Sequence, residues 1–303
     1  MSIAIAPPRS ALVANLICLA SMLTWAVGLP AAQLVIPLIP PVTLTALRAT
    51  LAAATLLPLW LVIEGPGPLL GANWGRGIAV GGICIGFGAV LLLIALARTD
   101  PVTVEVITAI MPVIGISMEV ATEGRRLTLA LILGLALSLA GGFLAYGAGV
   151  GAMKLGVGAL AAFGSVLAFT WGSRATVTAF PALTPLGRTT ITVTGAAILT
   201  SLAAVIYTGL GGPATQWAAL GLPEWAALAL FGVGSLAVSQ VLWIMAVGQL
   251  GIGLSALHMN AVPFYVMLIM FALGSAWNWP QAYGALIVAF GVLIAQGLIR
   301  LPR

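Results

Sequence analysis

Residues 92–113, LLIALARTDPVTVEVITAIMPV, and residues 243–264, WIMAVGQLGIGLSALHMNAVPF, decide how this chain is expected to fold. Each stretch joins two long apolar runs, and the two stretches align without a gap. The alignment matches Ala95 with Ala246 and Pro112 with Pro263. Matched landmarks at corresponding points of two long apolar regions predict that the chain contains a duplicated unit.

Other landmarks recur in the same order in the two halves. They are the pairs Thr24-Trp25 and Thr170-Trp171, Arg48 and Arg188, and Gly142 and Gly291. We therefore divide the chain into a first repeat over residues 1–150 and a second repeat over residues 151–303.

The composition places most of the chain in lipid. Of 303 residues, 62% are hydrophobic and 6% are charged, and the mean hydropathy is +1.20. A soluble globular domain has about 25% charged residues, so this chain has too little polar surface to cover its apolar residues in water. The net charge of +5 comes from basic residues scattered singly near the ends of apolar runs. That pattern favours membrane orientation over a nucleic-acid partner.

Ten apolar runs are long enough to cross a hydrocarbon core of about 30 Å, which takes roughly 20 helical residues. Backbone groups in lipid have no water to bind, so continuous apolar runs of this length are expected to be helices. The predicted spans are residues 10–30, 41–63, 75–96, 101–121, 127–147, 156–178, 184–208, 223–247, 251–273 and 279–300. The predicted fold class is an all-α membrane protein with ten transmembrane helices.

Five spans in each repeat is an odd number, and this has a geometric consequence. The second repeat must enter the membrane from the opposite side, so the repeats are expected to be inverted about a pseudo-two-fold axis in the membrane plane. Inverted repeats can form two arrangements, each open to one side, around a site near the midplane. The pattern therefore predicts a central cavity and a carrier that works by alternating access. A non-transporting channel or scaffold is the alternative from another class.

The distribution of Lys and Arg predicts the orientation, because these residues are retained on the cytoplasmic side. With the N-terminus inside, the cytoplasmic side holds Arg9, Arg76, Arg125, Arg126, Arg174, Arg188, Arg300 and Arg303. The opposite side then holds Arg48, Arg98 and Lys154. We predict a multi-pass protein of a bacterial inner membrane with both termini in the cytoplasm.

The five-plus-five plan resembles the EamA-type transporters of the drug/metabolite transporter superfamily. The resemblance is carried by the Trp in spans one and six, the Arg entering spans two and seven, and the ends IALARTD…AIMPV and IMAVGQL…NAVPF. It covers nearly the whole chain, and within the superfamily the chain looks most like the bacterial aromatic amino acid exporters. The resemblance implies a basket-like ten-helix fold with a central cavity, and export of aromatic and some other neutral amino acids.

Polar side chains in a membrane helix rarely face lipid, so a polar stripe indicates the bundle interior or a wet cavity. In span eight, Ser235, Ser239 and Trp243 recur every four residues on one helix face. They are expected to contact the solute, or alternatively to hold helices together through the serines. Trp25 and Trp171 lie inside their spans and are matched by the repeat, so we expect both to line the cavity.

Span nine holds the single histidine of the chain, His258, on one face with Tyr265. An intramembrane ionisable group is a functional candidate, and the alternative is that His258 donates to a backbone carbonyl. Asn260 lies on a different face and is a candidate for ligand contact or for packing. Pro112 and Pro263 each remove a backbone donor inside a span, so the matched pair predicts two hinges or two static kinks.

Span four carries Glu105 and Glu119 on one face. A buried, unpaired carboxylate favours its protonated form, so either residue is a candidate proton carrier. We expect both to lie close enough to the membrane interfaces to be hydrated. The predicted substrate-binding residues are Trp25, Glu105, Trp171, Ser239, Trp243, His258, Asn260 and Tyr265.

The residue inventory disfavours an enzyme. A paired-aspartate protease needs two Asp residues, whereas the chain has only Asp100, and a two-His metal site lacks its second His. We therefore expect neither a metal nor a cofactor.

Among carriers, the charged residues separate the substrate classes. A carrier of phosphate compounds would need cations in its cavity, and the candidate Arg residues lie at span ends. An organic-cation exporter would need a buried carboxylate, for which Glu105 is the candidate. Neutral amino acids fit best, and the expected partners are this small solute and membrane lipid. The energy source stays open between proton exchange, for which one His or Glu could suffice, and facilitated diffusion, which the few buried titratable groups favour.

Overall fold

The computed structural model describes residues 8–99, 101–145 and 156–299. Within these ranges the chain is helical, with no β-strand, and a helical stretch occupies each of the ten predicted ranges. Seven stretches are long and apolar enough to cross a membrane: Ala11–Val35, Pro41–Glu64, Trp74–Arg98, Val106–Glu123, Pro185–Gly209, Leu222–Leu250 and Ile252–Ala272. Two apolar helices are shorter, Leu129–Leu144 and Trp279–Ala295. The chain is a multi-pass membrane protein.

Proline is the first residue of four helices of the first half, because proline fits the first helical turn, where the backbone N–H has no partner within the helix. The elements are α1 (Pro8–Val35), α2 (Pro41–Glu64), α3 (Pro66–Gly71), α4 (Trp74–Val80), the π-helix η1 (Gly81–Gly86), α5 (Phe87–Arg98), α6 (Pro101–Ala109), α7 (Met111–Glu123) and α8 (Leu129–Ala145). Gly65 and Gly124 follow α2 and α7 with φ of 79° and 67°, a conformation that glycine adopts without strain.

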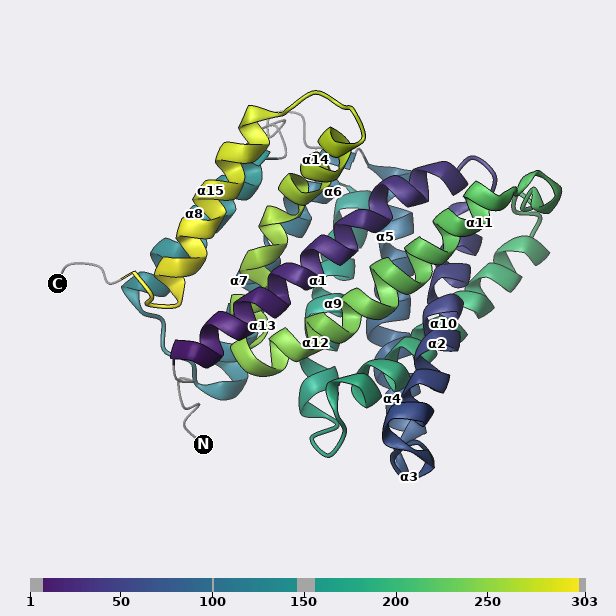
Figure 1. The fold of residues 1–303 in the computed structure, drawn as a ribbon, viewed down its shortest axis with the longest axis horizontal. Coiled ribbons are helices and arrows are strands. Elements are labelled where there is room, and N and C mark those ends of the chain that lie inside the picture. Colours follow the sequence, from purple (N-terminus) through teal and green to yellow (C-terminus); the bar gives the residue numbers. More distant parts are fainter. Residues whose placement is uncertain (1–7, 100, 146–155, 300–303) are drawn as a thin grey trace.

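The second half runs from teal through green to yellow in Figure 1. Its elements are α9 (Val157–Thr178), α10 (Pro185–Gly209), the 3₁₀-helix η3 (Trp217–Ala219), α11 (Leu222–Ala229), the π-helix η4 (Leu230–Val238), α12 (Ser239–Leu250), α13 (Ile252–Leu257), the 3₁₀-helix η5 (His258–Ala261), α14 (Val262–Ala272) and α15 (Trp279–Ala295).

Irregular segments occur at matched points of the two halves. The π-helices η1 and η4 interrupt the third span and the eighth span, at positions that correspond when the gap-free alignment is extended toward the N-terminus. The fourth and ninth spans are broken where α7 begins at Met111 and α14 begins at Val262, so that Pro112 and Pro263 each stand second in a helix. Proline ends the preceding helix because it supplies no N–H and crowds the turn before it.

Hydrogen bonds between the halves also occur in matched pairs. Ser21 Oγ in α1 donates to the carbonyl oxygen of Ser239 at 2.8 Å, and Ser165 Oγ in α9 donates to the carbonyl oxygen of Gly88 at 2.8 Å. Gly88 and Ser239 are matched by the same alignment that pairs Pro112 with Pro263. Helix α1 therefore packs on α12 of the second half as α9 packs on α5 of the first.

These contacts correct the predicted register of the first and sixth spans. Because Ser21 corresponds to Ser165, Trp25 corresponds to Phe169 and not to Trp171. A shift of two residues turns a side chain by about 200° around the helix, so the predicted register placed Trp171 on the wrong face.

The register of α2 against α10 differs from the prediction in the same way. Gly232 in η4 packs against the backbone of Arg48, and Gly81 in η1 packs against the backbone of Thr192. Thr192, and not Arg188, is therefore the counterpart of Arg48. The first half has a cation at this position and the second half has a hydroxyl group.

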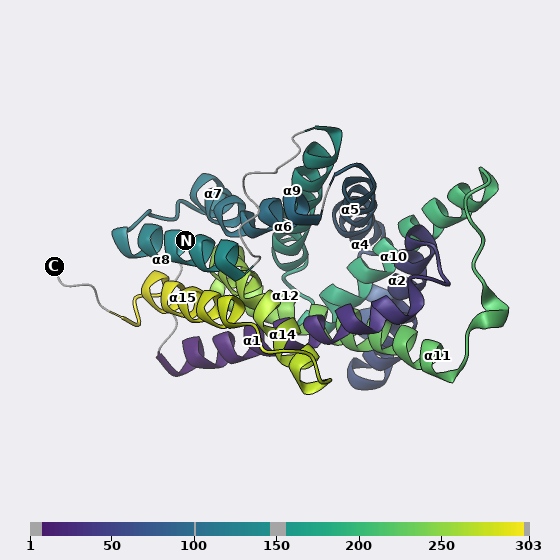
Figure 2. The same ribbon diagram turned by 90° about the horizontal axis from the view of Figure 1, so that it is seen from above.

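Corresponding helices run antiparallel where they meet. Gly134 of α8 packs against Gly291 of α15, and Gly141 packs against Gly284, so positions later in α8 meet positions earlier in α15. A Cβ at Gly141 would lie 2.5 Å from the carbonyl oxygen of Gly284. Glycines at these contacts let the two backbones touch, and α8 and α15 lie side by side in both views (Figures 1 and 2). By these contacts Gly141, and not the predicted Gly142, is the counterpart of Gly291.

Candidate functional site

A cavity of about 380 Å³ lies between the helices of the two halves. Its lining includes no residue of α8 or α15, which lie together at one end of the molecule (Figure 2). Most of the lining is apolar, with a few polar side chains. Its volume falls within the roughly 300–1,000 Å³ typical of small-molecule sites, and its composition is also typical of them.

Arg48 is in the wall of this cavity. Its guanidinium lies over the rings of Trp25 and Phe231, with its central carbon 5.3 Å and 4.2 Å from their centroids. Its Nε donates to the carbonyl oxygen of Phe231 at 3.3 Å, and its Nη2 donates to the carbonyl oxygen and the Oγ of Ser235 at 3.2 Å. The sequence predicts Arg48 at a span end, whereas in the structure it lies seven residues, or about 10 Å, along α2 from Pro41.

The aromatic lining comes from matched positions of the two halves. Trp25 and Phe169 both line the cavity, whereas Trp171 is 47% exposed and lies outside its lining. The ring of Phe169 stacks on Trp243, with centroids 6.2 Å apart. Trp243 is buried and its Nε1 donates to Ser173 Oγ at 3.0 Å. This hydrogen bond fixes the indole on which the ring of Phe169 stacks.

Two amides complete the polar lining. Gln240 is 2% exposed, and its Nε2 has no hydrogen-bond partner among the described residues. Asn260 donates from Nδ2 to the carbonyl oxygen of Ser138 at 3.2 Å and to its Oγ at 3.1 Å, which leaves Oδ1 for another partner. Gln240 was not among the predicted residues, although a glutamine inside an apolar span is a signal that could have identified it.

Three other predicted residues lie outside the lining. Ser239 is buried and donates to the carbonyl oxygen of Ser235 at 2.6 Å, a contact within its own helix. His258 is buried with its Nδ1 3.2 Å from the carbonyl oxygen of Leu254, which is the alternative role considered for it. Tyr265 packs against the apolar cluster that closes one end of the cavity.

The predicted hinges border the cavity. Pro112 and Pro263 are buried, and the residues before them, Met111 and Val262, line the cavity from matched positions. The side chain of Glu105 lies outside the described residues.

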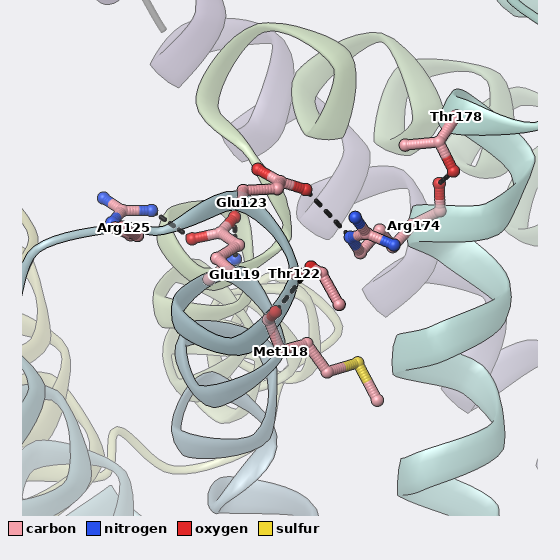
Figure 3. A network of polar contacts seen from close by, with 8 residues as sticks. Met118, Glu119, Thr122, Glu123, Arg125, Arg174 and Thr178 are labelled. Atoms are coloured by element: carbon pink, nitrogen blue, oxygen red, sulfur yellow. Dashed lines mark hydrogen bonds and ion pairs between the residues drawn. The ribbon is translucent and has the colours of Figure 1, made fainter. Parts of the chain in front are cut away.

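Two ion pairs lie near the C-terminal ends of α7 and α9 (Figure 3). Glu119 is 2% exposed; its Oε1 accepts from the Gly253 N–H at 3.0 Å and its Oε2 pairs with Arg125. Glu123 pairs with Arg174, Oε1 to Nε, at 2.8 Å. The prediction that Glu119 is hydrated is therefore wrong, because the guanidinium and a backbone N–H replace water around its carboxylate.

A packed apolar cluster separates these ion pairs from the cavity. It contains Cys18, Met22, Ala26, Met111, Val166, Trp243, Ile244, Ala246, Val247, Ile252, Ala256 and Val262. Met111 and Val166 also line the cavity, so the cluster is its floor. At the opposite end, Leu29, Leu92 and Leu96 line the cavity and are 38%, 37% and 48% exposed, and we interpret this end as the open one.

The fold and the cavity define a multi-pass membrane protein with an internal cavity of small-molecule size. Residues 12–147 match the model of the EamA-like transporter family. This match covers less than half of the chain, and over these residues it supports the resemblance to EamA-type transporters seen in the sequence.

Individual proteins are also similar to the chain. A segment of 61 residues is 38% identical to the uncharacterized transporter YyaM of Bacillus subtilis (strain 168), and it spans 20% of each chain. A solved structure described only as the crystal structure of a protein has a TM-score of 0.80 and 22% identity, over 95% of this chain and 98% of that one. The second similarity supports the fold alone. Among the described residues, no group of three or more His, Cys, Asp or Glu is placed to hold a metal ion.

Proposed function

We propose that the protein is a carrier that exports small neutral amino acids, aromatic ones among them, across a bacterial inner membrane by alternating access. The observation that carries the proposal is a solute-sized cavity between the two halves, which we interpret as open at one end and closed at the other. A carrier needs both features in any one state, because a path open at both ends would be a channel.

The proposed mechanism depends on two inverted five-helix repeats. Support comes from the paired serine bonds, the matched π-helices and the antiparallel contact of α8 with α15. A two-fold axis that relates two antiparallel helices is perpendicular to the helix direction. Because membrane helices cross the bilayer, such an axis lies in the membrane plane. Exchanging the conformations of the two repeats would then close the open end and open the closed one.

The proposed substrate follows from the lining. The rings of Trp25 and Phe169 suit an aromatic or apolar side chain, and Asn260 offers a hydrogen-bonding group. The guanidinium of Arg48 opposes an organic cation. With both termini in the cytoplasm, the closed side is cytoplasmic and the cavity faces outward.

The test is transport by the purified protein in liposomes. Vesicles loaded with unlabelled L-phenylalanine are diluted into labelled L-phenylalanine, L-threonine or tetraethylammonium, with and without a pH gradient. We expect counterflow of phenylalanine above that of protein-free vesicles, and none of tetraethylammonium. A dependence on the pH gradient would identify protons as a coupled partner.

The opposite selectivity would overturn the proposal. If tetraethylammonium alone moved, and Glu105→Gln stopped it, the protein would be an organic-cation exporter. Flux that grows linearly with concentration and shows no counterflow would indicate a channel.

A further inference from the structure

We propose that Arg48 binds a carboxylate of the transported solute. This inference rests on the proposed function and adds a chemical requirement to it. The solute must carry a carboxylate, whether or not it carries an amino group. The starting observation is a cation in the wall of a largely apolar cavity within the membrane.

The hydrogen bonds of Arg48 leave part of its guanidinium free. Nε and Nη2 are used by Phe231 and Ser235, and Nη1 has no hydrogen-bond partner among the described residues. These partners are neutral oxygens, and no described carboxylate forms an ion pair with Arg48. A charge in a low-dielectric site is costly without a counter-ion, so an anionic group of the solute would be favoured beside Nη1.

The geometry favours a carboxylate over other anions. The guanidinium carbon lies over the rings of Trp25 and Phe231, which offer no hydrogen-bond acceptor as strong as an anion, and the N–H groups of an arginine form a fork that matches two carboxylate oxygens. One positive charge balances one carboxylate. A phosphate monoester carries a charge near −2 at neutral pH, so it would remain uncompensated.

The other polar groups fit the rest of an amino acid. Gln240 follows Ser235 by five residues, which is about 7.5 Å along a helix, and its buried Nε2 is a donor without a described partner. Asn260 keeps Oδ1 as an acceptor, a suitable group for an ammonium. Phe169 supplies an aromatic surface for the side chain.

The repeat supplies a matched control. Thr192 occupies the position of Arg48 in the second half, so this subsite belongs to one repeat only. Arg188, near the start of α10, donates from Nε to the Phe180 carbonyl at 2.8 Å and from Nη2 to the Pro181 carbonyl at 3.1 Å. It lies outside the cavity lining, so Arg188→Gln removes an arginine of the same kind without touching the subsite.

The experiment measures binding and transport separately. Tryptophan fluorescence of the full-length protein in detergent is titrated with L-phenylalanine, 3-phenylpropionate and phenethylamine, since Trp25 lies beside Arg48. We expect the wild type to bind both carboxylates at least about tenfold more tightly than phenethylamine, as expected for a charged hydrogen bond. Arg48→Gln is expected to weaken the binding of both carboxylates about 10- to 100-fold and to leave phenethylamine unchanged, and Arg48→Lys to cause a smaller loss.

The outcomes separate the subsite from the proposed function. Carboxylate binding that depends on Arg48, without counterflow of any neutral amino acid, would support the subsite and contradict the function. Phenylalanine counterflow with an unchanged KM in Arg48→Gln would contradict the subsite alone. An equal loss in Arg188→Gln or in Glu105→Gln would also contradict it. If Arg48→Gln does not fold, the wild-type protein alone provides the test. Tighter binding of 3-phenylpropionate than of phenethylamine would support the subsite, and equal or weaker binding would contradict it.

Discussion

At the scale of single residues, the position of a side chain on its helix decides whether it can meet a solute. Phe169 and Trp171 are two residues apart on α9, yet Phe169 lines the cavity and Trp171 is 47% exposed. Sequence similarity alone favoured Trp171, because Thr-Trp pairs occur in both halves. Contacts between helices fix the register, and such contacts are not visible in a weak internal repeat.

This pair of aromatic residues gives a direct test. Phe169→Ala is expected to raise the KM for L-phenylalanine roughly 2- to 10-fold, because it removes an aromatic contact of about 0.5–1.5 kcal/mol. The KM for L-threonine should change less. Concentration-dependent counterflow in liposomes measures both.

Trp171→Ala is the matched control, with a ring of similar size removed from the outer face of the same helix. Its KM values are expected to equal those of the wild type. A larger effect from Trp171→Ala than from Phe169→Ala would show that the lining face of α9 has been misassigned.

At the scale of elements, the sequence predicted the helices better than their interruptions. Every predicted span is occupied by a helical stretch, since long apolar runs in lipid leave the backbone few alternatives. The breaks before Pro112 and Pro263 follow from proline chemistry. The π-helices η1 and η4 carry no comparable signal, because a π-turn depends on packing around it. Arg48 was misplaced for a related reason, since its depth depends on where α2 lies relative to the membrane.

The contact between α8 and α15 is an element-scale prediction. Gly141→Ala would place a methyl group 2.5 Å from the Gly284 carbonyl oxygen and 2.8 Å from the Val288 backbone nitrogen, and backbone atoms cannot move aside cheaply. We expect a loss of about 1–3 kcal/mol in the free energy of unfolding, as for other overpacked sites. Unfolding by SDS, followed by circular dichroism, measures it.

Gly248→Ala serves as the comparison for this helix contact. It lies inside α12, and the nearest atom to an added Cβ is Val177 Cγ1, at an ordinary 3.8 Å. Its expected effect is neutral or stabilising by up to about 1 kcal/mol, because alanine favours helix more than glycine does. Equal destabilisation by both substitutions would mean that α8 and α15 do not touch at Gly141.

At the scale of the whole molecule, the two halves share a fold but differ where the solute meets them. Trp25 has the aromatic Phe169 as its counterpart in the second half, while Arg48 has Thr192 as its counterpart. The residues that pack the helices correspond between the two halves, whereas the polar residues of the cavity do not. This asymmetry fits a cavity that binds its solute in a single orientation. The ion-paired side is also unmatched, since Glu119 has Met270 at the position that the gap-free alignment assigns to it.

The closed side offers a test of alternating access through a native cysteine. Cys18 is fully buried in the apolar cluster beneath the ion pairs, with its Sγ 3.7 Å from the Ser255 carbonyl oxygen. In a Cys84→Ser background, Glu119→Ala removes a buried ion pair and the hydrogen bond to Gly253, worth about 1–3 kcal/mol. If these contacts hold the side closed, labelling of Cys18 by N-ethylmaleimide should be about tenfold faster.

Two comparisons decide whether faster labelling means opening of this side. Glu123→Ala breaks an ion pair whose side chains are 27% and 20% exposed, so we expect little change, because solvent-exposed pairs contribute little. In a Cys18→Ser background, the labelling rate of Cys84 reports on packing in another part of the protein, where Cys84 contacts Gly172. If Glu119→Ala accelerates labelling of Cys84 as much as that of Cys18, the substitution loosens the whole protein, and Glu119 is not part of a gate.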